Sequence, residues 1–254
     1  MKKWFGLLAL FLSSYLVFIV LTLPVSLLIN NVPLPKNIHF SGVQGTIWHA
    51  QIAQVNLGNT RLEKVTTRLS FLSLLSLSPE VELTFGDALL SGPEGEFTLR
   101  LSSDELSISK LSLLVAANDI ISQVTLPLPA TAQGNLEVLI DEMRFNYVKS
   151  DFNTLTCNTV VGSAIWNNAG VVALEKNVKL GKFSADLSCK NEAVTVIVNP
   201  KNNLGLSFSL YARMNRNLTG DGYLEPGEKF PQVLQSALPF LGNRNAQGRY
   251  LLKF

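Results

Sequence analysis

An uncharged apolar stretch near the amino terminus, WFGLLALFLSSYLVFIVLTLPVSLLI at 4–29, constrains this chain more than any other feature. A helix needs about 20 apolar residues to cross the hydrocarbon core of a bilayer, so the stretch is long enough to span a membrane. The alternative is a cleaved secretory signal. Its apolar part is about 7–15 residues long and ends at a pair of small residues, and this stretch fits neither criterion. We therefore predict an uncleaved anchor, with Pro24 ending or kinking the helix.

The charges that flank the anchor predict its orientation. Lys2 and Lys3 lie with the amino terminus on its short side, and basic residues favour the cytoplasmic face of a membrane. Residues 1–3 are then a cytoplasmic tail, 4–29 a transmembrane anchor and 30–37 a linker. Residues 38–254 form a single domain on the far side of the membrane.

The balance of charge in that domain excludes one class of partner. The chain has 254 residues, of which 47% are hydrophobic and 16% charged, a composition typical of a folded protein with a core. Lys2 and Lys3 account for two of the 21 basic residues, so the remainder balances the 19 acidic ones. Nucleic-acid binding depends largely on neutralising phosphates with basic side chains. We expect no nucleic-acid partner.

Beyond the proline-containing linker NNVPLPKN, apolar and polar residues alternate with a period of two, which is typical of half-buried strands. Short alternating or β-branched runs are bounded by turn sequences such as SGPEGE, NPKNN and LTGDG. The runs are EFTLRLS, ELSIS, NLEVLI, AVTVIV and LSFSL. This pattern predicts a mostly β, antiparallel, meandering domain, either as one curved sheet or as a sandwich, since alternation does not separate the two.

Helix signals are few. The segment KFPQVLQSALPFLG at 229–242 has Pro231 near its start and Gly242 at its end, and Pro239 limits it to a short helix. GRYLLKF then reads as a closing strand. The segment LSFLSLLSLS at 69–78 fits either a bend in a strand or a short helix.

Cys157 and Cys189 are the two cysteines of the chain, and both lie beyond the anchor. In an oxidising compartment the simplest state of such a pair is a disulfide, which closes a loop of about 30 residues and stabilises the fold by roughly 3–4 kcal/mol. Two buried thiols or a shared metal are the alternatives. The metal is the weaker of these, because the spacing is not that of a metal motif and no histidine is close in sequence.

Catalytic signatures are lacking. The two histidines, His39 and His49, are interpreted as surface or strand-edge residues. The chain has no nucleophile elbow, zinc-protease motif or phosphate-binding glycine loop. The carboxylate pairs at 104–105 and 141–142 point to opposite faces of a strand, so neither forms an acid–base couple. We predict no catalytic residue, metal site or cofactor, and hence no enzyme.

Two stretches share a glycine followed by a tryptophan: VQGTIWHAQIAQVNL, with Gly45 and Trp48, and VVGSAIWNNAGVVAL, with Gly162 and Trp166. They indicate either two related half-sheets or a chance similarity. A tryptophan inside an alternating strand is usually part of the core, so we expect both rings to pack there.

Taken together, these pieces resemble the protein N family of the type II secretion system (general secretion pathway protein N). The matching segments follow the family's order along almost the whole chain. They are SGVQGTIWHAQ, LPLPATAQGNLEVLI, CNTVVGSAIWNNA, ADLSCKN and LPFLGNRNAQGRYLLKF.

The resemblance implies a single-pass protein of the bacterial inner membrane with a periplasmic β-rich domain. It would be an accessory component of the apparatus that exports folded proteins, binding or helping to assemble other components. The implied partners are the inner-membrane platform and the secretin channel. Gly45, Trp48, Gly162 and Trp166 would be structural positions of the family. A second similarity in layout, to AsmA-like anchored proteins, implies instead a lipid-binding or lipid-transfer protein with an apolar β-groove.

Overall fold

The computed structural model describes most of the chain. The described residues are 2–31, 38–58, 60–87, 89, 92–121, 130–148, 151–173, 176–213 and 218–253. Most of the predicted linker therefore lies outside the described residues, and residues 30 and 31 belong to a helix.

The apolar amino-terminal stretch forms two helices, α1 (Lys2–Thr22) and α2 (Val25–Asn31). They separate at Pro24, whose ring removes a backbone donor and restricts the residue before it. Among the described helices, only Trp4–Thr22 is long and apolar enough to cross a membrane. Helix α2 packs against the first strand, and its Ile29 contacts a core cluster of the sheet. The end of the apolar stretch thus contacts the sheet.

The rest of the described chain is mostly β, as the sequence predicts. The thirteen strands are β1 (Ile38–Thr46), β2 (His49–Leu57), β3 (Thr60–Leu69), β4 (Glu80–Phe85), β5 (Glu94–Leu101), β6 (Glu105–Ala116), β7 (Ala130–Val148), β8 (Asp151–Ala173), β9 (Lys176–Lys190), β10 (Ala193–Val198), β11 (Leu206–Ala212), β12 (Thr219–Leu224) and β13 (Tyr250–Lys253).

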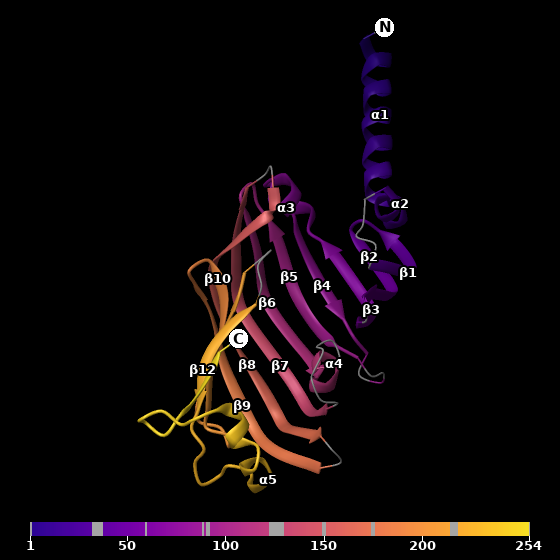
Figure 1. The fold of residues 1–254 in the computed structure, drawn as a ribbon. Coiled ribbons are helices and arrows are strands. Elements are labelled where there is room, and N and C mark those ends of the chain that lie inside the picture. The colour runs from indigo at the N-terminus through magenta and orange to yellow at the C-terminus, as the bar shows by residue number, and fades with distance from the viewer. Residues whose placement is uncertain are drawn as a thin grey trace.

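All of these strands form one open antiparallel sheet in which each strand pairs with the next along the chain (Figure 1). Of the two predicted arrangements, the structure is therefore the single sheet and not the sandwich. The edges of the sheet are β1 and β13. A meander of this kind places alternate connections at the same end of the strands, so the β1–β2 and β3–β4 connections share one end.

The sheet curls about one face. In Figure 1 the yellow carboxy-terminal strand β12 crosses in front of the orange part of the sheet. Side chains from strands that are not neighbours meet on this inner face. Trp166 of β8 and Leu206 of β11 both pack against a buried cluster that contains Leu180 and Phe183 of β9. The curvature thus buries part of the apolar face without a second sheet.

In the part of the chain that the structure describes, four short helices lie in the connections: α3 (Phe71–Leu75), α4 (Ala117–Ile121), α5 (Gln232–Gln235) and the 3-10 helix η1 (Leu238–Leu241). The single helix predicted at 229–242 is therefore two short ones, since Pro239 stands at the start of η1. Leu234 of α5 packs against the inner face, and the predicted closing strand is β13. The ambiguous segment at 69–78 contains a helix.

Candidate binding groove

The inner face of the curved sheet contains an apolar groove of about 440 Å³. Its volume falls within the roughly 300–1,000 Å³ that is typical of small-ligand sites. Five strands, β7 to β11, and the connection before β11 contribute to its wall. The lining residues are Leu136, Val138, Ala164, Trp166, Leu180, Phe183, Ser184, Ala185, Leu187, Val196, Val198, Leu204 and Leu206.

Strand pairing explains why these residues share one face. Directly opposed residues of an antiparallel pair point to the same side of the sheet. Leu136 of β7 lies opposite Trp166 of β8, which in turn lies opposite Phe183 of β9. The rings of Trp166 and Phe183 stack with their centroids 5.6 Å apart, and the indole N–H of Trp166 donates a hydrogen bond of 2.8 Å to the carbonyl oxygen of Gln133. The tryptophan is thus held as a wall of the groove, half-buried.

The chemistry of the lining suits an apolar guest. Ser184 is the one polar residue among the lining residues, and no charged side chain is among them. The ion pairs of the described residues join other side chains: Arg61–Glu63, Lys64–Asp87, Arg68–Glu82, Arg100–Glu80, Arg144–Glu142 and Arg249–Glu225. Such a surface can bury hydrocarbon but offers little to a polar substrate.

Shifted pKa values accompany the ion pairs and not the groove. A hydrogen bond from Lys64 holds the pKa of Asp87 below its ordinary value. Hydrogen bonds to Glu142 and Glu225 raise the pKa of Arg144 and Arg249. The lowered pKa of Asp87 contributes stability above its ordinary pKa, and that contribution is lost as the pH falls through the folded-state value.

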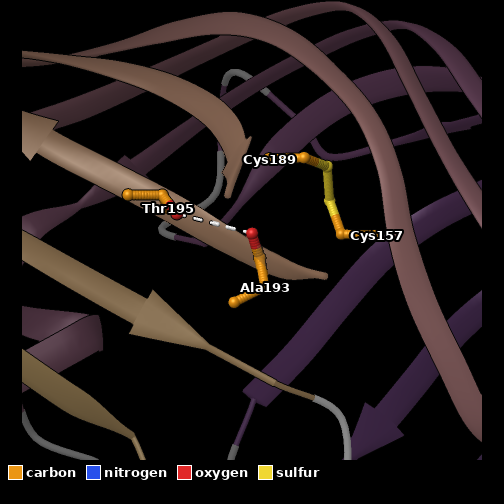
Figure 2. The surroundings of a disulfide bond; sticks show 4 residues. All are labelled: Cys157, Cys189, Ala193 and Thr195. Carbon is orange, nitrogen blue, oxygen red and sulfur yellow. Dashed lines mark hydrogen bonds between the residues drawn. A yellow bond between two sulfur atoms is a disulfide. The ribbon is translucent and has the colours of Figure 1, made fainter. Parts of the chain in front are cut away.

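Cys157 and Cys189 form a disulfide in this structure, with Cα atoms 5.8 Å apart (Figure 2). The bond joins β8 to β9 near one end of the pair. Cys157 is buried beside Phe145 and Val160, on an apolar cluster that extends from the groove wall through Leu187.

The two glycine–tryptophan stretches adopt different conformations. Gly45 has a φ of +92°, and Trp48 lies in the turn between β1 and β2, half-buried and outside any strand. The expectation of a strand tryptophan in the core is therefore wrong for Trp48. Gly162 and Trp166 both lie within β8. Both glycines allow close backbone contact, since a Cβ at Gly45 would lie 2.3 Å from the carbonyl oxygen of His49.

Close packing at Gly162 leads to a stability prediction. A Cβ there would lie 2.5 Å from the carbonyl oxygen of Leu139 on β7, so Gly162→Ala must push two paired strands apart. We expect Gly162→Ala to lower the free energy of unfolding by about 1–3 kcal/mol. Gly227→Ala is the matched control, because no atom lies within 4 Å of its added Cβ. Chemical denaturation followed by tryptophan fluorescence measures both, and equal stabilities for the two variants would contradict the packing argument.

The histidines were interpreted as surface or strand-edge residues, and both are exposed in the structure. His39 lies on the edge strand β1 and His49 at the start of β2. They are far from the groove lining in the pairing order of the strands. Among the described residues, no group of three or more His, Cys, Asp or Glu side chains is arranged to hold a metal ion.

Several groove residues are missed by sequence reasoning. The segment KNVKLGKFSADLSCK, now β9, provides Leu180, Phe183 and Ala185. The alternating apolar residues of this segment could have indicated a strand. However, the inward-facing positions are even-numbered before Gly181 and odd-numbered after it, which interrupts the pattern. That glycine has a φ of +88° and lies where the β8–β9 register shifts.

The fold and groove define a class of protein. Its described residues contain one helix able to span a membrane, followed by an open antiparallel sheet with an apolar inner face. The family described as "Type II secretion system (T2SS), protein N" matches residues 36–253. The chain belongs to this family, and it is therefore a component of the type II secretion system.

Curated relatives match almost the whole chain. A type II secretion system protein N from Aeromonas hydrophila is 29% identical over 258 residues, covering 100% of this chain and 98% of the relative. The protein of the same name from Vibrio cholerae serotype O1 is 26% identical over 251 residues, covering 98% and 97%. That of Klebsiella pneumoniae is 23% identical over 240 residues, covering 93% and 89%. No solved structure matches.

Proposed function

We propose that the protein is an accessory component of the type II secretion apparatus, anchored in the inner membrane by α1, that binds other components across the periplasm. The observation that carries this proposal is the apolar groove on the inner face of an otherwise open sheet. Leu136, Val138 and Trp166 in this groove are only partly buried, and apolar area left in water favours a partner that covers it.

The proposed topology rests on charge and redox chemistry. Lys2 and Lys3 precede the span, which favours a cytoplasmic amino terminus. Residues 38–254 then lie in the periplasm, an oxidising compartment in which the Cys157–Cys189 disulfide is stable.

The partner that fits the groove is an apolar segment of another secretion component, from the inner-membrane platform or the secretin. Backbone groups at the sheet edges β1 and β13 offer a second mode of contact, since an unpaired edge accepts an added strand. The groove is the stronger candidate because side chains of five strands converge on it.

A lipid-binding function is the second candidate, and the composition of the lining favours it. Acyl chains need only hydrocarbon contact, and Ser184 is the one polar residue of the lining. In that case the protein resembles AsmA-like proteins in activity as well as in layout, and it holds or transfers lipid between membranes.

Photo-crosslinking in cells distinguishes these functions. A crosslinking amino acid replaces Leu136 or Val138, which line the groove, or Glu137 or Leu139, which alternate with them on β7 and point to the other face. A second series follows 204–210, which includes Leu204 and Leu206 of the opposite wall. Adducts are identified by mass spectrometry.

Each outcome of the crosslinking identifies what the groove binds. Adducts to secretion proteins from Leu136 and Val138, with few from Glu137 and Leu139, support the assembly function and identify the partner. Phospholipid adducts from the same two positions support the lipid function instead. An absence of adducts from the groove positions contradicts both uses of the groove and moves binding to the edges β1 and β13.

A further inference from the structure

Helix α3 and the residues around it form an apolar projection that the sheet does not cover. Leu72, Leu75 and Leu77 are 75%, 70% and 86% exposed, and Phe71 is 51% exposed. The segment at 69–79 has no charged residue. Soluble surfaces rarely expose so many large apolar side chains in succession, so this projection requires a partner or a surrounding that accepts them.

The polar groups of the same segment are largely satisfied within it. The hydroxyl of Ser73 donates to the carbonyl oxygen of Ser70 at 2.6 Å and accepts a hydrogen bond of 2.9 Å from the backbone N–H of Glu80. The hydroxyl of Ser76 donates to the carbonyl oxygen of Ser73. These internal hydrogen bonds lower the cost of placing the helix in a poorly hydrated environment, where an unpaired polar group is costly.

Trp48 links the projection to the end of α1. The indole N–H of Trp48 donates a hydrogen bond of 2.9 Å to the carbonyl oxygen of Val20, and the ring of Trp48 contacts that of Phe71, with centroids 5.4 Å apart. The backbone N–H of Ile47 also donates to the carbonyl oxygen of Leu23. Figure 1 shows α3 at the upper end of the sheet, the end from which α1 rises.

These contacts fix the depth of α3 relative to the span. Val20 lies two residues before the end of the apolar helix at Thr22, which corresponds to about 3 Å along the helix axis. If α1 crosses the membrane, Trp48 lies at the level where the hydrocarbon core meets the headgroups, a position that tryptophan favours. Phe71 lies beside it.

We propose that α3 inserts Phe71, Leu72 and Leu75 into the outer surface of the membrane beside α1, as a second membrane contact of the sheet domain. The proposal rests on the proposed anchoring by α1. The occupant is the lipid surface because the projection is continuous with the span and uncharged. Two contacts, unlike a single helix, prevent the sheet from rotating about α1 and hold the groove in one orientation to the membrane.

Depth-dependent quenching tests this contact in the full-length protein. A single cysteine replaces Leu72 and carries an environment-sensitive fluorophore, with the parent protein as the labelling blank. The protein is reconstituted in vesicles of phosphatidylethanolamine and phosphatidylglycerol, with or without phosphatidylcholine brominated close to the headgroup. We expect the brominated lipid to lower the fluorescence at Leu72 about twofold.

Two further positions serve as controls. Val17→Cys labels the interior of the span. Leu89→Cys labels a leucine that is 90% exposed in the connection after β4, whereas α3 lies in the connection before it. The six residues of β4 separate the two ends by about 20 Å, so the fluorophore at Leu89 should not be quenched.

The pattern across the three labels decides the proposal. Quenching at Val17 and Leu72 but not at Leu89 supports it. Quenching at Val17 alone overturns it and leaves the anchor intact, and a blue-shifted but unquenched label at Leu72 overturns it in favour of a protein contact. Quenching at none of the three positions overturns both the anchor and the second contact.

Discussion

The double variant Cys157→Ala/Cys189→Ala is expected to lose about 3–4 kcal/mol of unfolding free energy relative to the oxidised protein. The bond closes a loop with a sequence separation of 32 and restricts the unfolded chain accordingly. Alanine is the appropriate replacement because Cys157 is buried in apolar surroundings beside Phe145, where a serine hydroxyl would lack a partner.

Reductant provides the control for this prediction. In chemical denaturation of the full chain in detergent, a thiol reductant should lower the midpoint of the parent protein to that of the double variant, and it should leave the variant unchanged. Under non-reducing conditions the parent protein should bind no alkylating reagent. Quantitative alkylation without reductant would show that the two cysteines are free, and a reductant effect on the variant would show that the stability change has another origin.

The strand class of the domain was predictable because several of its strands keep alternating or β-branched sequences. The runs at 96–102, 105–109, 193–198 and 206–210 fall on β5, β6, β10 and β11. Such patterns reflect one buried and one solvated face, which is a local property of each strand. The choice between a curved sheet and a sandwich depends on contacts between distant strands, and no single run encodes them.

The lengths of β7 and β8 were not predictable from alternation. The structure extends them to 19 and 23 residues, far beyond the run at 135–140. Register shifts interrupt their pairing at several places, including next to Gly134. Each extra residue in a bulge reverses which positions face inward, so one long strand reads in the sequence as several short, unrelated runs.

The contacts of Trp48 also could not be predicted from the local sequence. Its neighbours suggest a strand, but its indole donates to Val20, a residue 28 positions earlier in the anchor helix. Trp166 has a similar sequence context and instead lines the groove, where Phe183 stacks on it. The local sequence predicts that both rings pack, whereas the tertiary structure determines what each of them contacts.

A charge placed in the groove is expected to abolish binding of an apolar guest. Val138→Glu puts a carboxylate on the groove wall, and Leu139→Glu puts the same group on the opposite face of the same strand, where Leu139 is 41% exposed. Without a guest, both carboxylates remain hydrated, since Val138 is itself half-exposed. We therefore expect the two variants to differ little in stability.

With a guest present, the two variants should differ strongly. An acyl chain or an apolar protein segment would have to strip water from the carboxylate at position 138, and burial of an unpaired charge costs several kcal/mol. The affinity for the guest should fall by about 100-fold or more, since each 1.4 kcal/mol corresponds to a factor of ten. The measurement is the yield of adducts from a photo-crosslinker at Val198, on the other wall of the groove.

The comparison separates occupancy from folding. If the groove binds its guest, Val138→Glu removes the Val198 adducts, whether these are lipid or protein, and Leu139→Glu retains them. Equal loss in both variants would mean that the charge acts through the stability or assembly of the sheet. Full retention in Val138→Glu would mean that the guest avoids the wall formed by β7. The two positions are a suitable pair because the same carboxylate is placed on opposite faces of one strand.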